Sequence, residues 1–185
     1  MLLAVGCDGV FGLTRVLPPP DAPTILDCTR TPIILRPSDI SRLEWADQDP
    51  ATGTHVDHVA ESEPDDDLTY IASKIDGQLD LYTHLPIAST VTIDSVTVWI
   101  RARNETLPSS AQVGGAMQVG SALPWDDVYL GTAYSDLSSN VYATNPATNA
   151  PWTVDDVNGL SFGVRKAYSA DRVRVTQIWA AVACH

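Results

Sequence analysis

The sequence predicts an all-β fold, an antiparallel β-sandwich of the jelly-roll type, with an extended proline-rich N-terminal arm. Short runs that alternate apolar and polar residues recur along most of the chain, and Pro, Gly, Asn, Asp and Ser separate them at intervals of ~8–12 residues. Helical periodicity does not persist over ten residues anywhere. With 185 residues, 44% hydrophobic and 18% charged, the chain has enough apolar material for one core. We therefore expect an arm at residues 1–30 and a sandwich domain at residues 31–185.

The arm begins with an apolar stretch and continues into residues 17–23, which read LPPPDAP and favour an extended polyproline conformation. The apolar stretch is shorter than the ~20 residues that a membrane-spanning helix needs, so no membrane contact is predicted. An exposed apolar arm would promote aggregation, so we expect it to pack on its own core or on a neighbouring subunit. The predicted contact residues are Leu2, Leu3, Val5, Val10, Phe11, Leu13 and Val16.

The first part of the domain holds short β-type runs around a long acidic segment. Strands are predicted at residues 32–35, 41–45, 69–71 and 79–85, and an acidic loop at residues 47–67. In the run 79–85, alternation places Leu79, Leu81 and Leu85 on one face, with Asp80, Tyr82 and His84 on the other.

The longest predicted strand is residues 91–103. In it Val98 and Ile100 alternate with Trp99 and Arg101, so that one face is buried and the other is more polar. Trp99 lies on that polar face and is the one tryptophan singled out as a candidate contact residue for a partner or ligand. Residues 111–119 form the next run, where Gly114-Gly115 indicates a bulge or a close backbone approach.

The remaining predicted strands are residues 128–134, 141–144, 160–164 and 172–182. Between them Thr153 is expected to N-cap a helical turn at residues 154–157. Asp155 and Asp156 suit the positive N-terminal end of that turn.

The formal net charge of −12, from 23 acidic and 11 basic residues, disfavours nucleic acid as a partner because phosphates would be repelled. Asp65, Asp66 and Asp67, with Glu61 and Glu63 upstream, could chelate a hard cation such as calcium. They lack the spacing and the glycine of an EF-hand loop. We expect instead a solvated acidic loop that keeps a sheet edge from pairing.

No metal site or cofactor site is predicted. His55 and His58 lie near Pro50 and Gly53 and have no second ligand pair at zinc-like spacing, so they are expected to be exposed loop histidines. Cys184-His185 is only half of such a site. The odd number of cysteines, Cys7, Cys28 and Cys184, favours reduced thiols.

Catalytic residues are not predicted either, and we expect a protein that is not an enzyme. The sequence contains no G-x-S-x-G, no recognisable pairing of Ser or Cys with His, and no glycine-rich phosphate loop. Five tryptophans and six tyrosines could line a sugar-binding face, although such residues more often fill the core or subunit interfaces.

Four segments resemble a known class of proteins: LRPSDISRLEW from Leu35, AESEPDDDLTYIAS from Ala60, LDLYTHLP from Leu79 and PWTVDDVNGLSFGV from Pro151. Together they are similar to virion structural proteins of tailed bacteriophages and prophages that have a β-sandwich core. The resemblance spans residues 35–182 and leaves out the arm. It implies a place in the virion, after assembly in the host cytoplasm, and it carries over no catalytic residues.

The function expected from this resemblance is that of a capsid decoration or cement protein. Such a protein would bind the major capsid protein lattice, or other virion proteins, and neighbouring copies of itself through its arm, as a trimer or dimer. A neck or tail component is one alternative. A carbohydrate-binding adhesin module that recognises host-surface glycans is another, which makes a glycan a possible partner.

Overall fold

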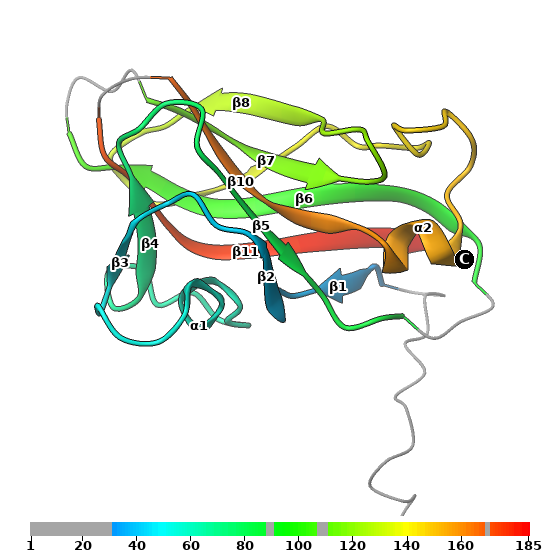
Figure 1. Cartoon of the computed structure of the whole chain (residues 1–185), viewed down its shortest axis with the longest axis horizontal. Coiled ribbons are helices and arrows are strands. Elements are labelled where there is room, and N and C mark those ends of the chain that lie inside the picture. Colours follow the sequence, from blue (N-terminus) through cyan, green and yellow to red (C-terminus); the bar gives the residue numbers. More distant parts are fainter. Residues whose placement is uncertain (1–30, 88–90, 107–110, 169–170) are drawn as a thin grey trace, which may run out of the picture.

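The structure, a computed structural model, describes residues 31–87, 91–106, 111–168 and 171–185. It confirms the antiparallel β-sandwich: two sheets pack face to face (Figure 1). Sheet A has the order β3-β4-β11-β6-β9, with β1 also paired to β11, and sheet B has the order β2-β5-β10-β7-β8. The arm and its seven predicted contact residues lie outside the described residues.

The strands of sheet A are β1 (Ile33–Leu35), β3 (Asp47–Asp49), β4 (Tyr70–Ser73), β6 (Ile93–Asn104), β9 (Ser135–Ser138) and β11 (Val173–Cys184). Those of sheet B are β2 (Asp39–Arg42), β5 (Leu79–Thr83), β7 (Gln112–Gln118), β8 (Trp125–Tyr129) and β10 (Ser161–Tyr168). Two helical turns, α1 (His55–Val59) and α2 (Val154–Asn158), complete the described elements.

The pair β6 and β11 forms the centre of sheet A. Both strands are 12 residues long, and they pair antiparallel from Val173 opposite Asn104 to Cys184 opposite Ile93. Alternate residues of each strand are fully buried, as the period of two requires when one face of a sheet covers a core. The other face of this pair points away from sheet B.

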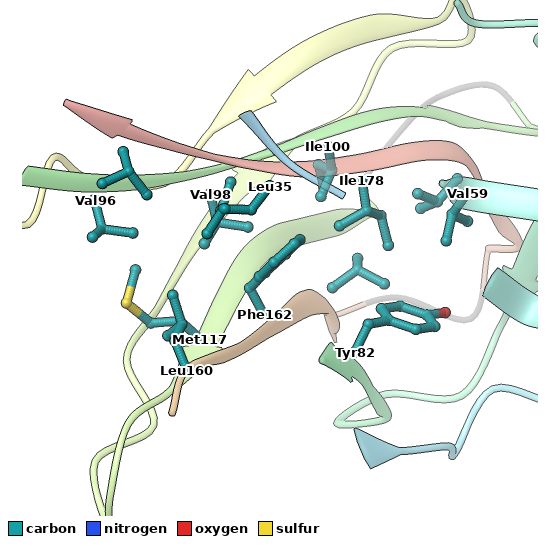
Figure 2. Packing of buried hydrophobic residues seen from close by; sticks show 14 of the residues in the cluster. Leu35, Val59, Tyr82, Val96, Val98, Ile100, Met117, Leu160, Phe162 and Ile178 are labelled. Carbon is teal, nitrogen blue, oxygen red and sulfur yellow. The ribbon is translucent and has the colours of Figure 1, made fainter. Parts of the chain in front are cut away.

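The core lies between the two sheets. Figure 2 shows Val98, Ile100 and Ile178 of sheet A directed towards Phe162 and Tyr82 of sheet B. All five side chains are completely buried. Burial of side chains of this size stabilises the fold by about 1.5–3 kcal/mol each before the entropy of ordering is subtracted. This contact is what holds the two sheets face to face.

The predicted close approach at Gly114-Gly115 is confirmed. A Cβ atom on Gly114 would lie 1.9 Å from the Asp126 carbonyl oxygen of β8, and one on Gly115 would lie 3.0 Å from the Val98 carbonyl oxygen of the opposite sheet. Gly163 in β10 is equally constrained, because a Cβ atom there would lie 1.9 Å from the Asp80 carbonyl oxygen. Glycine is therefore needed where these backbones meet.

The predicted turn after Thr153 is confirmed, and a second one was missed. Thr153 forms a capping box with Asp156 at α2, and Thr54 forms the same box with Asp57 at α1. Residues 54–57 read THVD, so the Thr-x-x-Asp signal was present in both places. Pro50, Gly53 and Pro64 suggested a continuous loop, yet all three lie outside the helical turn.

Several predicted strand positions were wrong. The second strand runs over Asp39–Arg42 instead of 41–45, and β8 spans Trp125–Tyr129 instead of 128–134. The run at 141–144 contributes only an isolated bridge between Tyr142 and Val96, whereas β9 at Ser135–Ser138 was not predicted. Its sequence, SDLS, has a single apolar residue, so no alternation was visible.

The alternation predicted for residues 79–85 is confirmed within β5, and only Leu85 departs from it. Tyr82 belongs to the main core, and Leu79 and Leu81 belong to a second buried cluster with Ala116 on the other side of sheet B. Asp80 is completely buried, whereas Leu85 is 75% exposed because it lies beyond the end of β5.

We predict that Gly163→Ala destabilises the protein strongly. The added methyl group cannot fit between β10 and the backbone of Asp80 unless the strands separate, which should lower the free energy of unfolding by about 3 kcal/mol. Urea denaturation followed by circular dichroism measures this change. Gly131→Ala is the matched control, because the nearest atom to a Cβ there is 4.0 Å away. Equal stability of the two variants would contradict the close approach.

Candidate functional site

The outer face of sheet A carries a row of aromatic and cationic side chains that includes the predicted contact residue Trp99. The rings of Trp99 and Trp179, on paired positions of β6 and β11, are stacked with centroids 5.8 Å apart and an interplanar angle of 6°. The guanidinium of Arg36 lies 5.4 Å from the centroid of the Trp179 ring. Because β1 and β6 flank β11 on opposite sides, Trp179 lies between Arg36 and Trp99. We call these three residues the tryptophan row.

Further along the same two strands, arginines and carboxylates form a network. Its arginines are Arg101 and Arg103 on β6, Arg174 on β11 and Arg172 just before β11, and its acidic partners are Asp47, Asp66, Asp67, Glu105 and Asp136. Aromatic rings lie against the same cations: Arg174 is 4.2 Å from the Tyr70 ring and Arg103 is 5.1 Å from the Tyr134 ring. We call this group the arginine–carboxylate network.

Asp66 and Asp67 of the predicted acidic loop belong to this network, while their side chains remain 41% and 56% exposed. Asp66 accepts hydrogen bonds from Arg101 at 2.7 and 3.1 Å, and Asp67 accepts hydrogen bonds from Arg103 and Arg174 at 2.8 Å each. Asp65 accepts from the hydroxyl of Thr69 at 3.0 Å. The loop is therefore held onto the sheet face by charge pairing. Within the described ranges, no group of three or more metal-ligating residues could hold an ion.

Charge pairing also changes the titration of this surface. Burial by itself raises the pKa of Glu105, but hydrogen bonds and charges from Arg174 and Arg172 outweigh it, so its pKa lies below the ordinary value. Asp67 behaves in the same way, with burial opposed by Arg174, Tyr134 and Arg103. Burial is the main reason that the pKa of Tyr134 rises to about 12. The carboxylates of Glu105 and Asp67 are therefore ionised throughout the neutral range.

A second polar cluster lies inside the molecule around Asp80. This carboxylate is completely buried and accepts hydrogen bonds from the backbone N–H groups of Glu44 and Trp45 at 2.7 and 2.9 Å. Its other oxygen lies 2.7 Å from Nδ1 of His55 and accepts a 3.3 Å hydrogen bond from the Tyr82 hydroxyl. Burial, together with the charge and hydrogen bond of Asp80, keeps the pKa of Tyr82 well above its ordinary value. The cluster joins α1 to sheet B.

The prediction of exposed loop histidines was wrong. His55 is 6% exposed and His58 is 2% exposed, because α1 packs against the sandwich. The ring nitrogens of His58 lie 2.7 Å from the Thr54 carbonyl oxygen and 2.9 Å from that of Pro50, so the ring ties the preceding loop to the helical turn.

The C-terminal residues also differ from expectation. Cys184 is disulfide-bonded, which corrects the prediction of reduced thiols. His185 places Nδ1 2.9 Å from a carboxylate oxygen of Asp94. Both side chains therefore take part in structural contacts. Cys7 and Cys28 lie outside the described residues.

The outer face of sheet B exposes aromatic side chains. Trp125 is 42%, Tyr129 69% and Tyr168 62% exposed. Gln112 of β7 pairs with Tyr129 of β8 and with Tyr168 of β10, so the two tyrosines occupy one row across three strands. Trp125 projects from the same strand as Tyr129 at an even spacing, and Arg165 lies 4.2 Å from its ring. We call Trp125, Tyr129 and Tyr168 the aromatic face.

Sequence reasoning missed the aromatic face as a site. Trp45 and Trp152 are buried, in agreement with the general expectation for tryptophan, but Trp125 is not. The alternation of Trp125, Asp127 and Tyr129 was the available signal, and it was overlooked because the strand was placed three residues too late. Pairing with Tyr168, about 40 residues further on, could not be read from local spacing.

Comparison of the chain with known protein families gives no match, and comparison with curated proteins gives none either. In the part of the chain that the structure describes, no helix has the length and apolar character needed to cross a membrane.

We predict that Glu105→Gln lowers stability at neutral pH but much less in acid. The folded pKa of Glu105 lies below 4.5, its ordinary value, so the unfolded chain takes up the proton first as the pH falls. The stabilisation is fully present above pH 4.5 and is lost as the pH drops through the folded pKa. At pH 7 the variant should lose about 2 kcal/mol, the usual worth of hydrogen bonds to charged groups.

Urea denaturation of both proteins at pH 7 and at acidic pH measures this difference. Glu63→Gln, which removes an exposed carboxylate outside the network, is the control and should behave like the wild type. If the two free energies of unfolding instead differ by the same amount at pH 7 and at the most acidic pH measured, the charge of Glu105 is not what stabilises the fold.

Proposed function

We propose that this protein is a non-enzymatic virion structural protein of a tailed phage, a decoration or cement protein that binds the major capsid protein lattice and neighbouring copies. Three lines support the proposal. Four sequence segments resemble virion structural proteins, the fold is the sandwich that the resemblance implies, and the arm supplies an apolar attachment segment. The net charge of −12 suits an outer surface better than the DNA-filled interior.

The observation that carries the proposal is the aromatic face. Tyrosine and tryptophan are the residue types that dominate binding energy at protein interfaces, because each buries a large area with little loss of rotamer freedom. Trp125, Tyr129 and Tyr168 present such side chains together on one face of a rigid sheet. The face and the arm give the protein two contact elements, and attachment through two elements strengthens binding in a symmetric lattice.

The buried polar groups support a structural role as well. Asp80 and His55 are hydrogen-bonded to each other and buried, so they join β5 to α1. The disulfide at Cys184 is compatible with a particle that leaves the reducing cytosol, since disulfides persist on virion surfaces.

We predict that antibody-gold labelling of intact virions decorates the head uniformly in electron micrographs. Labelling confined to the neck or tail would instead support a neck or tail component.

We predict that Leu3→Asp combined with Phe11→Asp leaves the sandwich folded and weakens binding to undecorated heads, because two apolar arm contacts are replaced by charges. If the double variant saturates heads at the wild-type concentration, the arm is not the attachment element.

A second candidate function is glycan binding, which the aromatic face also favours. Aromatic rings exposed on one sheet face offer stacking surfaces for pyranose rings, with Asp127 and Gln112 beside them as hydrogen-bonding groups. The tryptophan row offers less surface to a sugar, because Trp99 and Trp179 are less exposed than Trp125.

We predict that, if glycans are the ligand, a glycan array probed with the full-length protein gives signals that disappear in Trp125→Ala with Tyr168→Ala. The same double variant should still be folded, since both side chains project from the sheet into solvent. Val141→Ala, another exposed apolar position, serves as the matched control. Array signals that survive in the double variant would exclude the aromatic face as the sugar site.

A further inference from the structure

The exposed side chain of Ile34 lies beside the tryptophan row and near the point where the arm joins the domain. Ile34 of β1 is 43% exposed and pairs with Ala181 of β11, which in turn pairs with Thr97 of β6. This row lies next to the row formed by Arg36, Trp179 and Trp99. The first described residue, Thr31, is only three positions before Ile34. Ile34 and the tryptophan row therefore lie near the residue at which the arm joins the domain.

The arm contains a segment whose chemistry fits this surface. Residues 17–23 read LPPPDAP, and proline-rich segments in the polyproline conformation bind to surfaces formed by tryptophan and other aromatic side chains. Such a segment loses little conformational entropy on docking because its backbone is already restricted.

The length of the connecting chain allows the segment to reach the tryptophan row of its own domain. Residues 24–30 can span about 23 Å when extended. Trp179 lies three residues along β11 from Val182, the partner of Ile33, which is about 10 Å along a strand. The connecting chain is therefore long enough for the segment to reach Trp179.

The charges of Arg36 and Asp21 also favour contact between residues 17–23 and the tryptophan row. Arg36 borders the tryptophan row, and among the described residues its buried Nη1 atom has no hydrogen-bond partner. The other terminal nitrogen donates only a long bond of 3.4 Å to the Ser62 carbonyl oxygen. Asp21 is the single charged residue within 17–23 and would supply the missing acceptor.

We propose that residues 17–23 dock in cis on the tryptophan row, with the prolines against Trp99 and Trp179 and the Asp21 carboxylate on Arg36. The consequence for assembly rests on the proposed function: docking fixes the base of the arm, so that the apolar residues 1–16 leave the sandwich from a defined place and direction. A fixed base reduces the entropy lost when those residues bind a partner.

The test uses ¹⁹F NMR of the full-length protein labelled with 5-fluorotryptophan. Its five tryptophans give five resonances, and Trp99→Phe and Trp179→Phe assign the two that matter. Pro18, Pro19 and Pro20 replaced together by alanine, and separately Asp21→Lys, should shift these two resonances. The signals of Trp45, Trp125 and Trp152 should stay unchanged. Asp8→Lys, the same charge reversal elsewhere in the arm, is the matched control and should shift none.

A charge swap tests the ion pair. Arg36→Glu alone should shift the Trp99 resonance in the same sense as Asp21→Lys, and the two substitutions together should restore the wild-type position. The proposal is overturned if the Trp99 and Trp179 signals are the same in the wild type and in the arm variants. It is equally overturned if the shifts depend on protein concentration, which would indicate docking between copies.

These measurements need no virus particle. Failure of head labelling would therefore leave the docking result standing, and failure of docking would leave the labelling result standing.

Discussion

The antiparallel pairing of β6 with β11 is the constraint on which the other features depend. Its register places Val98, Ile100 and Ile178 together on the inner face, where they meet sheet B, and it places Trp99 beside Trp179 on the outer face. A slip of one residue would exchange the two faces and would put arginines into the core. The core and the outer surface of sheet A are therefore determined by one alignment of two strands.

The second requirement is that charges near this sheet be compensated. Each arginine of the arginine–carboxylate network is only about a quarter exposed, so an unpaired guanidinium there would be costly. The carboxylates that pair with them are Asp66 and Asp67, Asp47 of β3, Asp136 of β9, and Glu105. The surplus of acidic residues thus serves partly to neutralise sheet A, and this explains why Asp66 and Asp67 are paired with arginines of the sheet.

The two sheets differ in what they offer to a partner. Sheet A presents cations that are already paired, together with a tryptophan row next to the arm, whereas sheet B presents exposed tyrosines and a tryptophan. A sandwich of this kind can contact its own arm on one face and another molecule on the other. Such a division would serve the assembly role that we propose, because each face can be optimised separately.

The fold class, the long strands and the Thr153 cap follow from the sequence, because alternation and capping are local patterns that need only a few adjacent residues. It identified Trp99 as outward-facing for the same reason. Only the tertiary structure decided that His55 is buried against Asp80, 25 residues away, and that Asp66 pairs with Arg101. Those contacts depend on how sheets and loops pack across long sequence separations, and no local pattern encodes that packing.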